Sequence, residues 1–219
     1  MELTDAILQR RSIRGFRSDP IPQETLRRVL ELASRAVSAQ NTQPWEFAVV
    51  TGEPLEALRR ANIEDLEADR EPDYPDVPLE GVGLDRARVV GKQLYGSMGI
   101  ERGDRERRHW WLQRGFRFFD APAVILLYMD EHWDEMAHRF EMGTIAQNLC
   151  LAAMEFGLGT CVEYQAIMYQ RGIREQLDLP VGKRFACGIA IGYPDDSFPA
   201  NQVVTPRESV DAMTQWYGF

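Results

Sequence analysis

Three arginines and one serine stand within five positions near the start of the chain. Arg10, Arg11 and Arg14 flank Ser12 in a protein whose formal net charge is −9. Guanidinium groups bind a phosphate through paired, charge-assisted hydrogen bonds, and a serine hydroxyl adds a further donor. The same residues could instead form a solvated, positively charged helix end, where arginine complements the helix dipole. The cluster alone therefore leaves both interpretations open.

A second polar stretch, from Ser38 to Trp45, lies between a helical pattern and a strand pattern. It reads Ser-Ala-Gln-Asn-Thr-Gln-Pro-Trp. Pro44 excludes Gln43 from the α region, so we expect the chain to enter the strand in an extended conformation. The side chains of Ser38, Asn41 and Gln43 offer hydroxyl and amide groups that can hydrogen-bond the edge of a heterocycle. This stretch is a candidate ligand-binding loop.

The elements that position these groups follow from hydrophobic periodicity and from helix and turn signals. Thr4 is the predicted N-cap of a first helix that ends near Arg10, so the arginines must bind an anion with their side chains, against an unfavourable helix C-terminus. A second helix is predicted to start around residues 19–22 and to continue to about residue 37. Further helices are predicted over residues 55–66, 84–119, 140–156 and 172–179, and strands over residues 46–51, 121–128, 160–164 and 185–193.

The segment between residues 55 and 118 has an unusual composition. An acidic, proline-containing loop over residues 71–83 precedes a stretch in which arginines alternate with Tyr95, Trp110 and Trp111. A long segment of this kind is more often a lid or a binding element than a tether. Aromatic residues among arginines could also indicate nucleic acid, but Asp104 and Glu106 interrupt the positive charge. Most of these arginines are expected to pair with acids on their own helix.

Composition narrows the class of protein. The chain has 219 residues, of which 44% are hydrophobic and 27% charged, as in ordinary globular proteins, and its acid excess argues against a nucleic-acid surface. Cys150, Cys161 and Cys187 form no Cys-x-x-Cys pair and indicate buried, reduced thiols. No signal peptide is visible, and the longest apolar run, residues 123–129, is too short to span a bilayer. We expect a soluble, cytoplasmic protein without membrane or nucleic-acid partners.

The motifs of several enzyme classes are missing. Gly81-Val82-Gly83 lacks the third glycine of a dinucleotide fingerprint, because residue 86 is Arg, and no Walker motif occurs. His109, His132 and His138 have no metal-ligand spacing, and no nucleophile elbow is present. The sequence therefore predicts no catalytic side chain and no metal site, and a cofactor should carry any chemistry.

Arg-Arg-Ser-x-Arg at residues 10–14, followed by Ser-x-x-Asn-x-Gln-Pro-Trp at residues 38–45, resembles the FMN-dependent nitroreductase family. The similarity continues through residues 157–160, residues 189–194 and Arg207. Strands alternating with helices would by themselves favour a parallel sheet. The resemblance implies instead an α+β, nitroreductase-like fold, with a mostly antiparallel central sheet flanked by helices. It also implies one FMN-binding domain over residues 1–219, with approximately residues 55–118 as a variable lid or substrate segment.

The resemblance further implies an intertwined homodimer with FMN at the subunit interface and an exchanged C-terminal segment. Three aromatic residues among the last four, Trp216, Tyr217 and Phe219, fit a tail that packs against a partner subunit. Cofactor contacts are implied at twelve positions. Arg10, Arg11, Ser12, Arg14 and Arg207 would contact the phosphate and the polar edge of the flavin; Ser38, Asn41 and Gln43 would come from the other subunit; and Glu163, Tyr164, Gln165 and Ala166 would form the turn near flavin N5.

The function implied is that of an FMN-dependent NAD(P)H oxidoreductase. NADPH or NADH would deliver a hydride and leave before an electron-poor aromatic substrate, such as a nitroaromatic compound or a quinone, takes its place in a ping-pong cycle. Arg14 is the expected positive charge near flavin N1 and O2. Two alternatives stay open: a reductive dehalogenase of the same fold, acting on halophenols or halotyrosine, and a flavin-binding carrier or sensor with little turnover.

Overall fold

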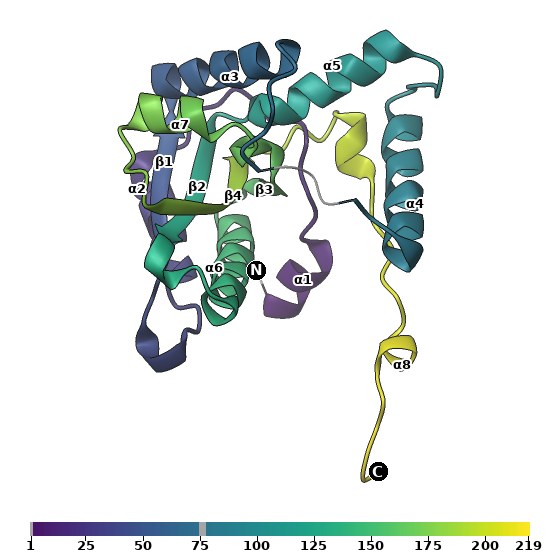
Figure 1. The fold of residues 1–219 in the computed structure, drawn as a ribbon. Helices are drawn as coiled ribbons and strands as arrows, with labels where there is room; N and C mark the ends of the chain where they lie inside the picture. The colour runs from purple at the N-terminus through teal and green to yellow at the C-terminus, as the bar shows by residue number, and fades with distance from the viewer. Residues whose placement is uncertain (1, 75–77) are drawn as a thin grey trace.

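A four-stranded antiparallel sheet lies at the centre of the structure (Figure 1). The computed structural model describes residues 2–74 and 78–219. The strands are β1 (Glu46–Thr51), β2 (Ala123–Asp130), β3 (Gly159–Glu163) and β4 (Lys183–Gly192), in the spatial order β1-β2-β4-β3. Each neighbouring pair is antiparallel. The predicted α+β fold is thereby confirmed, and β3 and β1 form the two edges.

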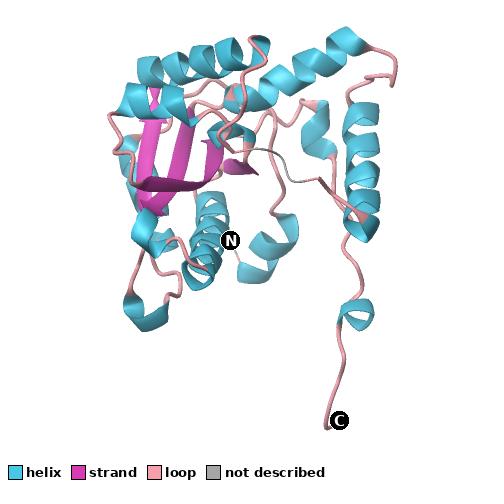
Figure 2. Cartoon of the chain, viewed as in Figure 1, coloured by secondary structure: helices cyan, strands magenta, loops and turns pink. Residues whose placement is uncertain are grey.

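Both faces of the sheet are covered by helices, as Figure 2 shows. The helices are α1 (Leu3–Gln9), α2 (Gln23–Ala33), α3 (Gly52–Glu67), α4 (Gly81–Ser97), α5 (Arg105–Phe116), α6 (Met136–Glu155), α7 (Gln170–Leu177) and α8 (Val210–Met213). Side chains alternate across the central strand β2: Ile125 and Leu127 pack with residues of α2 and α6, whereas Val124 and Leu126 pack with residues of α3 and α7. Since successive residues of a strand point to opposite faces, this run is buried on both sides, as predicted.

Several predicted helix boundaries are wrong: the helix predicted over residues 84–119 is two helices, α4 and α5, and α6 begins at Met136 rather than at residue 140. α1 begins at Leu3 with Glu2 at the N-cap position, so Thr4 lies inside the helix. α2 begins only after Pro22 and ends at Ala33, about four residues before the predicted end. Its C-cap, Ser34, donates its backbone N–H to the carbonyl of Leu30 and closes the last turn. Apolar residues beyond this point continue the helical spacing, but tertiary structure overrides that local pattern.

The segment predicted as a lid has parts in different surroundings. α3 buries Leu55 and Leu58 in the core, whereas α4 buries no residue and stands at the side of the body in Figure 1. Part of the predicted acidic loop, residues 75–77, lies outside the described residues. At the other end of the segment, Phe118, Phe119 and Asp120 all have left-handed backbone conformations, with φ of 57°, 50° and 57°. Such strain in bulky residues persists only where the surroundings hold it.

The last sixteen residues, 204–219, form an extended segment that we call the C-terminal arm. It leaves the body alongside α4 and ends far from the sheet (Figure 1). Trp216, Tyr217 and Phe219 are exposed, with Phe219 fully so at 102%. Within one chain, therefore, the aromatic residues of the arm have no core to pack into. No helix in residues 2–74 and 78–219 has the length and apolar character needed to cross a membrane.

Candidate cofactor-binding site

The Arg10–Arg14 segment leaves the end of α1 and runs beside the edge strand β3. Ser12 forms a parallel bridge with Thr160, and the N–H of Ile13 donates to the carbonyl of Thr160 over 2.9 Å. Gly159 permits this approach, because a Cβ there would stand 2.5 Å from a side-chain carbon of Ile13. The segment is thus joined to the sheet by a single parallel bridge, which holds it at the edge beside β3.

A buried asparagine far along the chain fixes the end of this segment. The Oδ1 of Asn201 accepts hydrogen bonds from the backbone N–H groups of Arg14, at 2.7 Å, and Gly15, at 3.2 Å. Its amide nitrogen donates to the carbonyls of Gly15, at 2.7 Å, and Asp195, at 2.9 Å. Asn201 is only 1% exposed. Sequence reasoning missed this residue, because nothing in its local sequence marks a contact that spans 187 positions.

Arg114 of α5 holds the same segment from the other side. Its Nη2 donates to the carbonyl of Arg14 over 3.0 Å, and its Nη1 forms an ion pair with Asp120 at 2.7 Å. Burial lowers the pKa of Arg114, and the Asp120 carboxylate opposes that effect. The guanidinium of Arg14 lies 5.9 Å from the ring centre of Phe119. The strained turn at residues 118–120 is therefore part of the support of Arg14.

The arginines of the segment form no ion pair within residues 2–74 and 78–219, unlike most arginines of the chain. Among the described residues, no carboxylate forms an ion pair with Arg10, Arg11 or Arg14, whereas Arg17 pairs with Asp19 at 3.2 Å. Arg10 and Arg11 border a cavity of about 150 Å³, and the Nε of Arg11 is buried without a hydrogen-bond partner. All three arginines are partly buried rather than spread into solvent. The arrangement leaves positive charge available for an anion.

The Ser38–Gln43 loop follows α2 and is strained. Gln40, Asn41 and Gln43 have φ of 52°, 60° and 47°. Gln43 therefore avoids the α region as predicted from Pro44, but it is left-handed rather than extended. Its N–H donates to Ser38 Oγ over 3.1 Å, while Asn41 and Gln43 are exposed. Left-handed non-glycine residues of this kind cluster at functional sites.

Glu141 of α6 ties this loop to the core. Its carboxylate accepts the backbone N–H of Ala39 over 2.6 Å and lies 3.4 Å from the hydroxyl of Thr42. It is buried, with 3% exposure, on a helix that also buries Ile145 and Leu149. Sequence reasoning did not single out Glu141. Its spacing of four and eight residues from these two apolar positions is a signal that could have found it.

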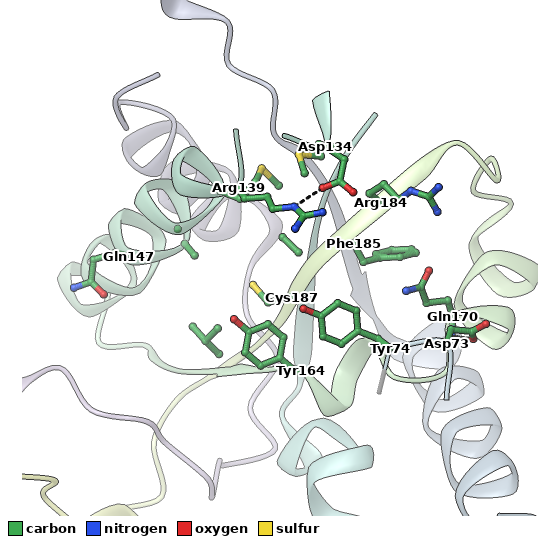
Figure 3. Close-up of a pocket in the computed structure, with 16 residues that line it drawn as sticks. Asp73, Tyr74, Asp134, Arg139, Gln147, Tyr164, Gln170, Arg184, Phe185 and Cys187 are labelled. Carbon is green, nitrogen blue, oxygen red and sulfur yellow. Dashed lines mark hydrogen bonds and ion pairs between the residues drawn. The ribbon is translucent and has the colours of Figure 1, made fainter. Parts of the chain in front are cut away.

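The side chains of Tyr164, Gln165 and Ala166, which follow β3, point in different directions. Ala166 is fully buried against the position of Gly188, and the Gln165 side chain lies over Gly115. Tyr164 is 55% exposed and stacks on Tyr74, with ring centres 5.9 Å apart and planes 7° from parallel. Figure 3 shows these two rings at the edge of a cavity of about 760 Å³. Only Tyr164 of the turn presents its side chain to that cavity.

Residues of α6 and β4 supply much of the remaining wall of the large cavity, among them Met142, Gly143, Phe185 and Cys187. Asp134 and Arg139 form an ion pair at 2.7 Å across its rim (Figure 3). The cavity is therefore partly aromatic and partly polar, as small-molecule sites are.

The predicted contacts do not all meet within one chain. Arg207 lies in the C-terminal arm, where it donates to Thr205 and borders a cavity of about 540 Å³ beside α4. The Ser38–Gln43 loop and the arm stand on different sides of the body from each other in Figure 1, and both lie apart from the Arg10–Arg14 segment. The structure thus unites the segment with β3 and its following turn, and leaves the other predicted groups separate.

The histidines and cysteines play no part in a metal site of the described residues, where no group of three potential ligands was found. His109 lies 2.7 Å from Glu67 on the surface. Cys150, Cys161 and Cys187 are free and buried, as predicted. Burial raises the pKa of Cys161 and of Cys187 to about 12.

Comparison with known proteins agrees with the geometry of the segment and the sheet. The family model of the Nitroreductase family matches residues 7–193. A nitrobenzene nitroreductase of Ectopseudomonas oleovorans is 35% identical over 97% of this chain and 95% of its own length, and the nitroreductase NfnB of Mycolicibacterium smegmatis is 32% identical over 94% and 89%.

Solved structures give the same result. The FMN and NADPH-dependent nitroreductase NfnB of Sphigopyxis sp. strain HMH is 33% identical, with a TM-score of 0.95 over the whole of both chains. An iodotyrosine deiodinase bound to FMN is only 21% identical, with a TM-score of 0.63, and shares the fold. The antiparallel sheet, the arginine segment bridged to β3 and these similarities lead to one conclusion: the chain belongs to the nitroreductase family.

Proposed function

We propose that this protein is an FMN-dependent NAD(P)H oxidoreductase that reduces nitroaromatic compounds. The observation that carries the proposal is the partly buried arginine cluster beside β3, which forms no ion pair with a carboxylate of the described residues. The relatives of the chain include a nitrobenzene nitroreductase and two 4-nitrobenzoate reductases. A reductive dehalogenase is less supported, because the deiodinase similarity extends to the fold alone. The similarity to named reductases also favours an enzyme over a flavin carrier or sensor.

Arg10, Arg11, Ser12 and Arg14 would hold the phosphate and the polar edge of FMN. The residues fit that group: a guanidinium nitrogen of Arg11 is buried without a partner, and none of the three arginines forms an ion pair with an acid among the described residues. Guanidinium groups are suited to phosphate because they bind it through two parallel hydrogen bonds. When bound, FMN would supply the hydride-transfer chemistry that the side chains of this protein lack.

The other half of the site would come from a second copy of the chain. The Ser38–Gln43 loop and the C-terminal arm, which carries Arg207, both lie apart from the arginine segment of their own chain (Figure 1). Exposed apolar side chains support an intertwined homodimer. They lie on α1, on α6 and along the arm, and include Leu3, Leu8, Met136, Phe140, Val210, Met213, Trp216, Tyr217 and Phe219.

The cavity beside Tyr164 is the proposed place for the aromatic substrate and for the nicotinamide that precedes it. Tyr74 and Tyr164 form a flat aromatic wall, and an electron-poor ring stacks favourably on such a surface. Tyr74 belongs to the segment proposed as the lid. Its backbone N–H donates to the carbonyl of Met168 over 3.3 Å. One cavity used in turn by both reactants is consistent with a ping-pong cycle.

The three buried free thiols fit the cytoplasm, where we place the protein.

The proposal is tested by measuring flavin content and turnover of the purified full-length protein. We expect one FMN per chain and oxidation of NADPH or NADH that depends on nitrobenzene or 4-nitrobenzoate. Replacing both Arg10 and Arg14 with Gln should weaken FMN binding at least 100-fold, since each charge-assisted hydrogen bond contributes about 1.5–3 kcal/mol. The control is Arg17→Gln, an exposed arginine three positions further on.

Three results would overturn the proposal. They are failure of the wild type to bind FMN, equal FMN affinity in the double variant and the control, and turnover of 3-iodotyrosine without turnover of any nitroarene. A quinone acceptor serves as the test for electron transfer in general, and bound FMN that no acceptor reoxidises would favour the carrier alternative.

A further inference from the structure

The large cavity beside Tyr164 has an apolar part and a charged part. Met129, Met142, Phe185 and Cys187 contribute to the apolar lining. An aromatic ring packs well against side chains of this kind. A charged substituent on such a ring would have to be bound by the polar part of the lining.

The charged part includes an arginine whose guanidinium group is only partly used. Arg139 lies near the start of α6 and donates from its Nε to Oδ1 of Asp134 over 2.7 Å. Within residues 2–74 and 78–219, neither Nη1 nor Nη2 of Arg139 has a hydrogen-bond partner. Both residues line the cavity, and Figure 3 shows the guanidinium group reaching over it from α6. The two terminal NH₂ groups of Arg139 are thus available to a molecule in the cavity.

The charges around Arg139 favour an anion at this part of the rim. The hydrogen bond from Arg139 lowers the pKa of Asp134, and the charge of Arg184 acts in the same direction, so two guanidinium groups share this carboxylate. Arg184 also pairs at 3.1 Å with Glu131, which lies outside the cavity lining. The other acid of the lining, Asp73, accepts a backbone N–H at the start of α7 over 2.8 Å. The positive end of the α6 dipole lies at the same rim and adds to the attraction.

Arg139 faces the part of the cavity where reduction is expected. Figure 3 shows Arg139 and Tyr164 on opposite sides of the cavity, with the hydroxyl groups of Tyr74 and Tyr164 pointing into it. The family resemblance implies flavin N5 near the turn that holds Tyr164. A nitroarene whose nitro group faced that turn would direct a substituent on the far side of its ring to Arg139.

We propose that Arg139 is a specificity-determining residue that binds a carboxylate substituent of the nitroaromatic substrate. The protein then binds nitrobenzoates more tightly than uncharged nitroarenes of the same size. The inference rests on the proposed function and narrows its substrate class. The paired NH₂ groups of a guanidinium match the two oxygens of a carboxylate. Asp134 holds Nε and so fixes the direction in which these groups point.

The test compares kcat/KM for 4-nitrobenzoate with that for 4-nitrobenzamide, an uncharged compound of the same size, in the full-length protein with FMN. Arg139→Gln should lower the value for 4-nitrobenzoate about 5- to 20-fold, chiefly through KM, and leave that for 4-nitrobenzamide within about twofold. The loss is moderate because the side chain of Arg139 is 66% exposed and water screens its charge. Arg139→Lys keeps the charge without the paired geometry and should recover part of the preference.

The matched control is Arg28→Gln. Arg28 is also an exposed arginine paired with an acid, Glu31, but it lies on α2 rather than at the cavity. This variant should leave the ratio of the two kcat/KM values unchanged. A general effect of removing one positive charge is thereby separated from a contact with the substrate.

The phosphates of NADPH are a second source of negative charge, and KM for NADPH distinguishes them from the substrate. We expect Arg139→Gln to leave this KM unchanged. A raised KM for NADPH with an unchanged KM for 4-nitrobenzoate would assign Arg139 to the nicotinamide donor and refute the proposal.

Binding without turnover gives an independent readout. Benzoate, which has no nitro group to reduce, should bind the oxidised wild type more tightly than benzamide, as followed by the change in flavin absorbance. Its affinity should fall in Arg139→Gln. In the wild type it should also fall as salt rises from about 20 to 300 mM, because ions screen the attraction between exposed charges. The affinity for benzamide should respond to neither change.

The failures are distinguishable. If the wild type reduces no nitroarene, the proposed function is wrong and this inference with it. If both nitroarenes are reduced but Arg139→Gln keeps the wild-type ratio of kcat/KM values, or if benzoate binds no more tightly than benzamide, the function stands and the role of Arg139 is refuted.

Discussion

The two polar stretches near the N-terminus, the Arg10–Arg14 segment and the Ser38–Gln43 loop, are held in different ways. The segment pairs with β3, is clamped by the buried amide of Asn201, and its arginines are partly buried. The loop contains three left-handed residues and is tied to the body chiefly by the carboxylate of Glu141. Its Asn41 and Gln43 side chains are exposed.

The difference shows what one chain can complete by itself. The backbone of the segment is already held along a neighbouring strand, so the phosphate contacts proposed for its arginines would need no rearrangement of that backbone. The loop keeps a costly backbone conformation while its side chains contact little in their own chain. Strain of this kind persists where function requires it. We infer that the loop is preformed for a partner chain, which is the division that the proposed dimer requires.

Removing the end of the C-terminal arm should have the largest effect on the cofactor site that two chains are proposed to share. Deletion of residues 210–219 removes Trp216, Tyr217 and Phe219, each expected to contribute about 2 kcal/mol when buried by a partner. We expect the dimer dissociation constant to rise about 10³- to 10⁴-fold and FMN to be lost with it. Analytical ultracentrifugation and flavin content measure both. Val181→Ser, at an exposed apolar residue elsewhere, is the control; a truncated protein that stays dimeric and yellow would contradict the expectation.

Asn201→Ala should damage the segment and spare the loop. It leaves two N–H groups and two carbonyls without their partner, so the free energy of unfolding should fall by about 3 kcal/mol. Urea denaturation of the apoprotein measures this. Gln202→Ala is the matched control, because Gln202 is the next residue, is exposed, and makes one hydrogen bond to the carbonyl of Asp196. A loss below 1 kcal/mol for Asn201→Ala would mean that the segment does not depend on this clamp.

Glu141→Gln should affect only the Ser38–Gln43 loop, and its effect should be weaker than that of Asn201→Ala. The amide still accepts from the N–H of Ala39, but without the negative charge, so the hydrogen bond should lose about 1 kcal/mol. FMN affinity should fall about fivefold, with the dimer and the unfolding of the body little changed. Glu31→Gln, at an exposed acid of α2 that pairs with Arg28, should have no effect. Unchanged FMN affinity in Glu141→Gln would show that the loop conformation is independent of this contact.

Thiol labelling should show the smallest effect. It tests whether β3, the edge strand beside the Arg10–Arg14 segment, opens in the folded protein. Because burial favours the neutral thiol and raises the pKa of Cys161 and Cys187 to about 12, hardly any thiolate exists at pH 8, and only the thiolate reacts. A disulfide reagent at pH 8 should modify none of the three cysteines in the folded protein and all of them in urea. Rapid labelling of Cys161 without denaturant would show that β3 opens.

Local patterns were sufficient for much of the fold. The end of α1 near Arg10, all four strands and the burial of β2 on both faces follow from periodicity and turn signals. The direction of the strands does not: their alternation with helices favours a parallel sheet, and only the family resemblance predicted the antiparallel one. Helix limits also failed where a cap or a tertiary contact competes with the local pattern, as at Ser34.

For the site, the sequence by itself determined which side chains could bind a phosphorylated cofactor, because residue type and close spacing carry that chemistry. It could not determine what holds them: Asn201, Arg114 and Glu141 act on backbone groups roughly 100 to 190 positions away. Nor could it show that both carboxyl oxygens of Glu163 are buried without a hydrogen-bond partner among the described residues, since burial and hydrogen bonding depend on every element around a residue. Tertiary structure alone decides such properties, because they arise from distances between groups that the linear order keeps far apart.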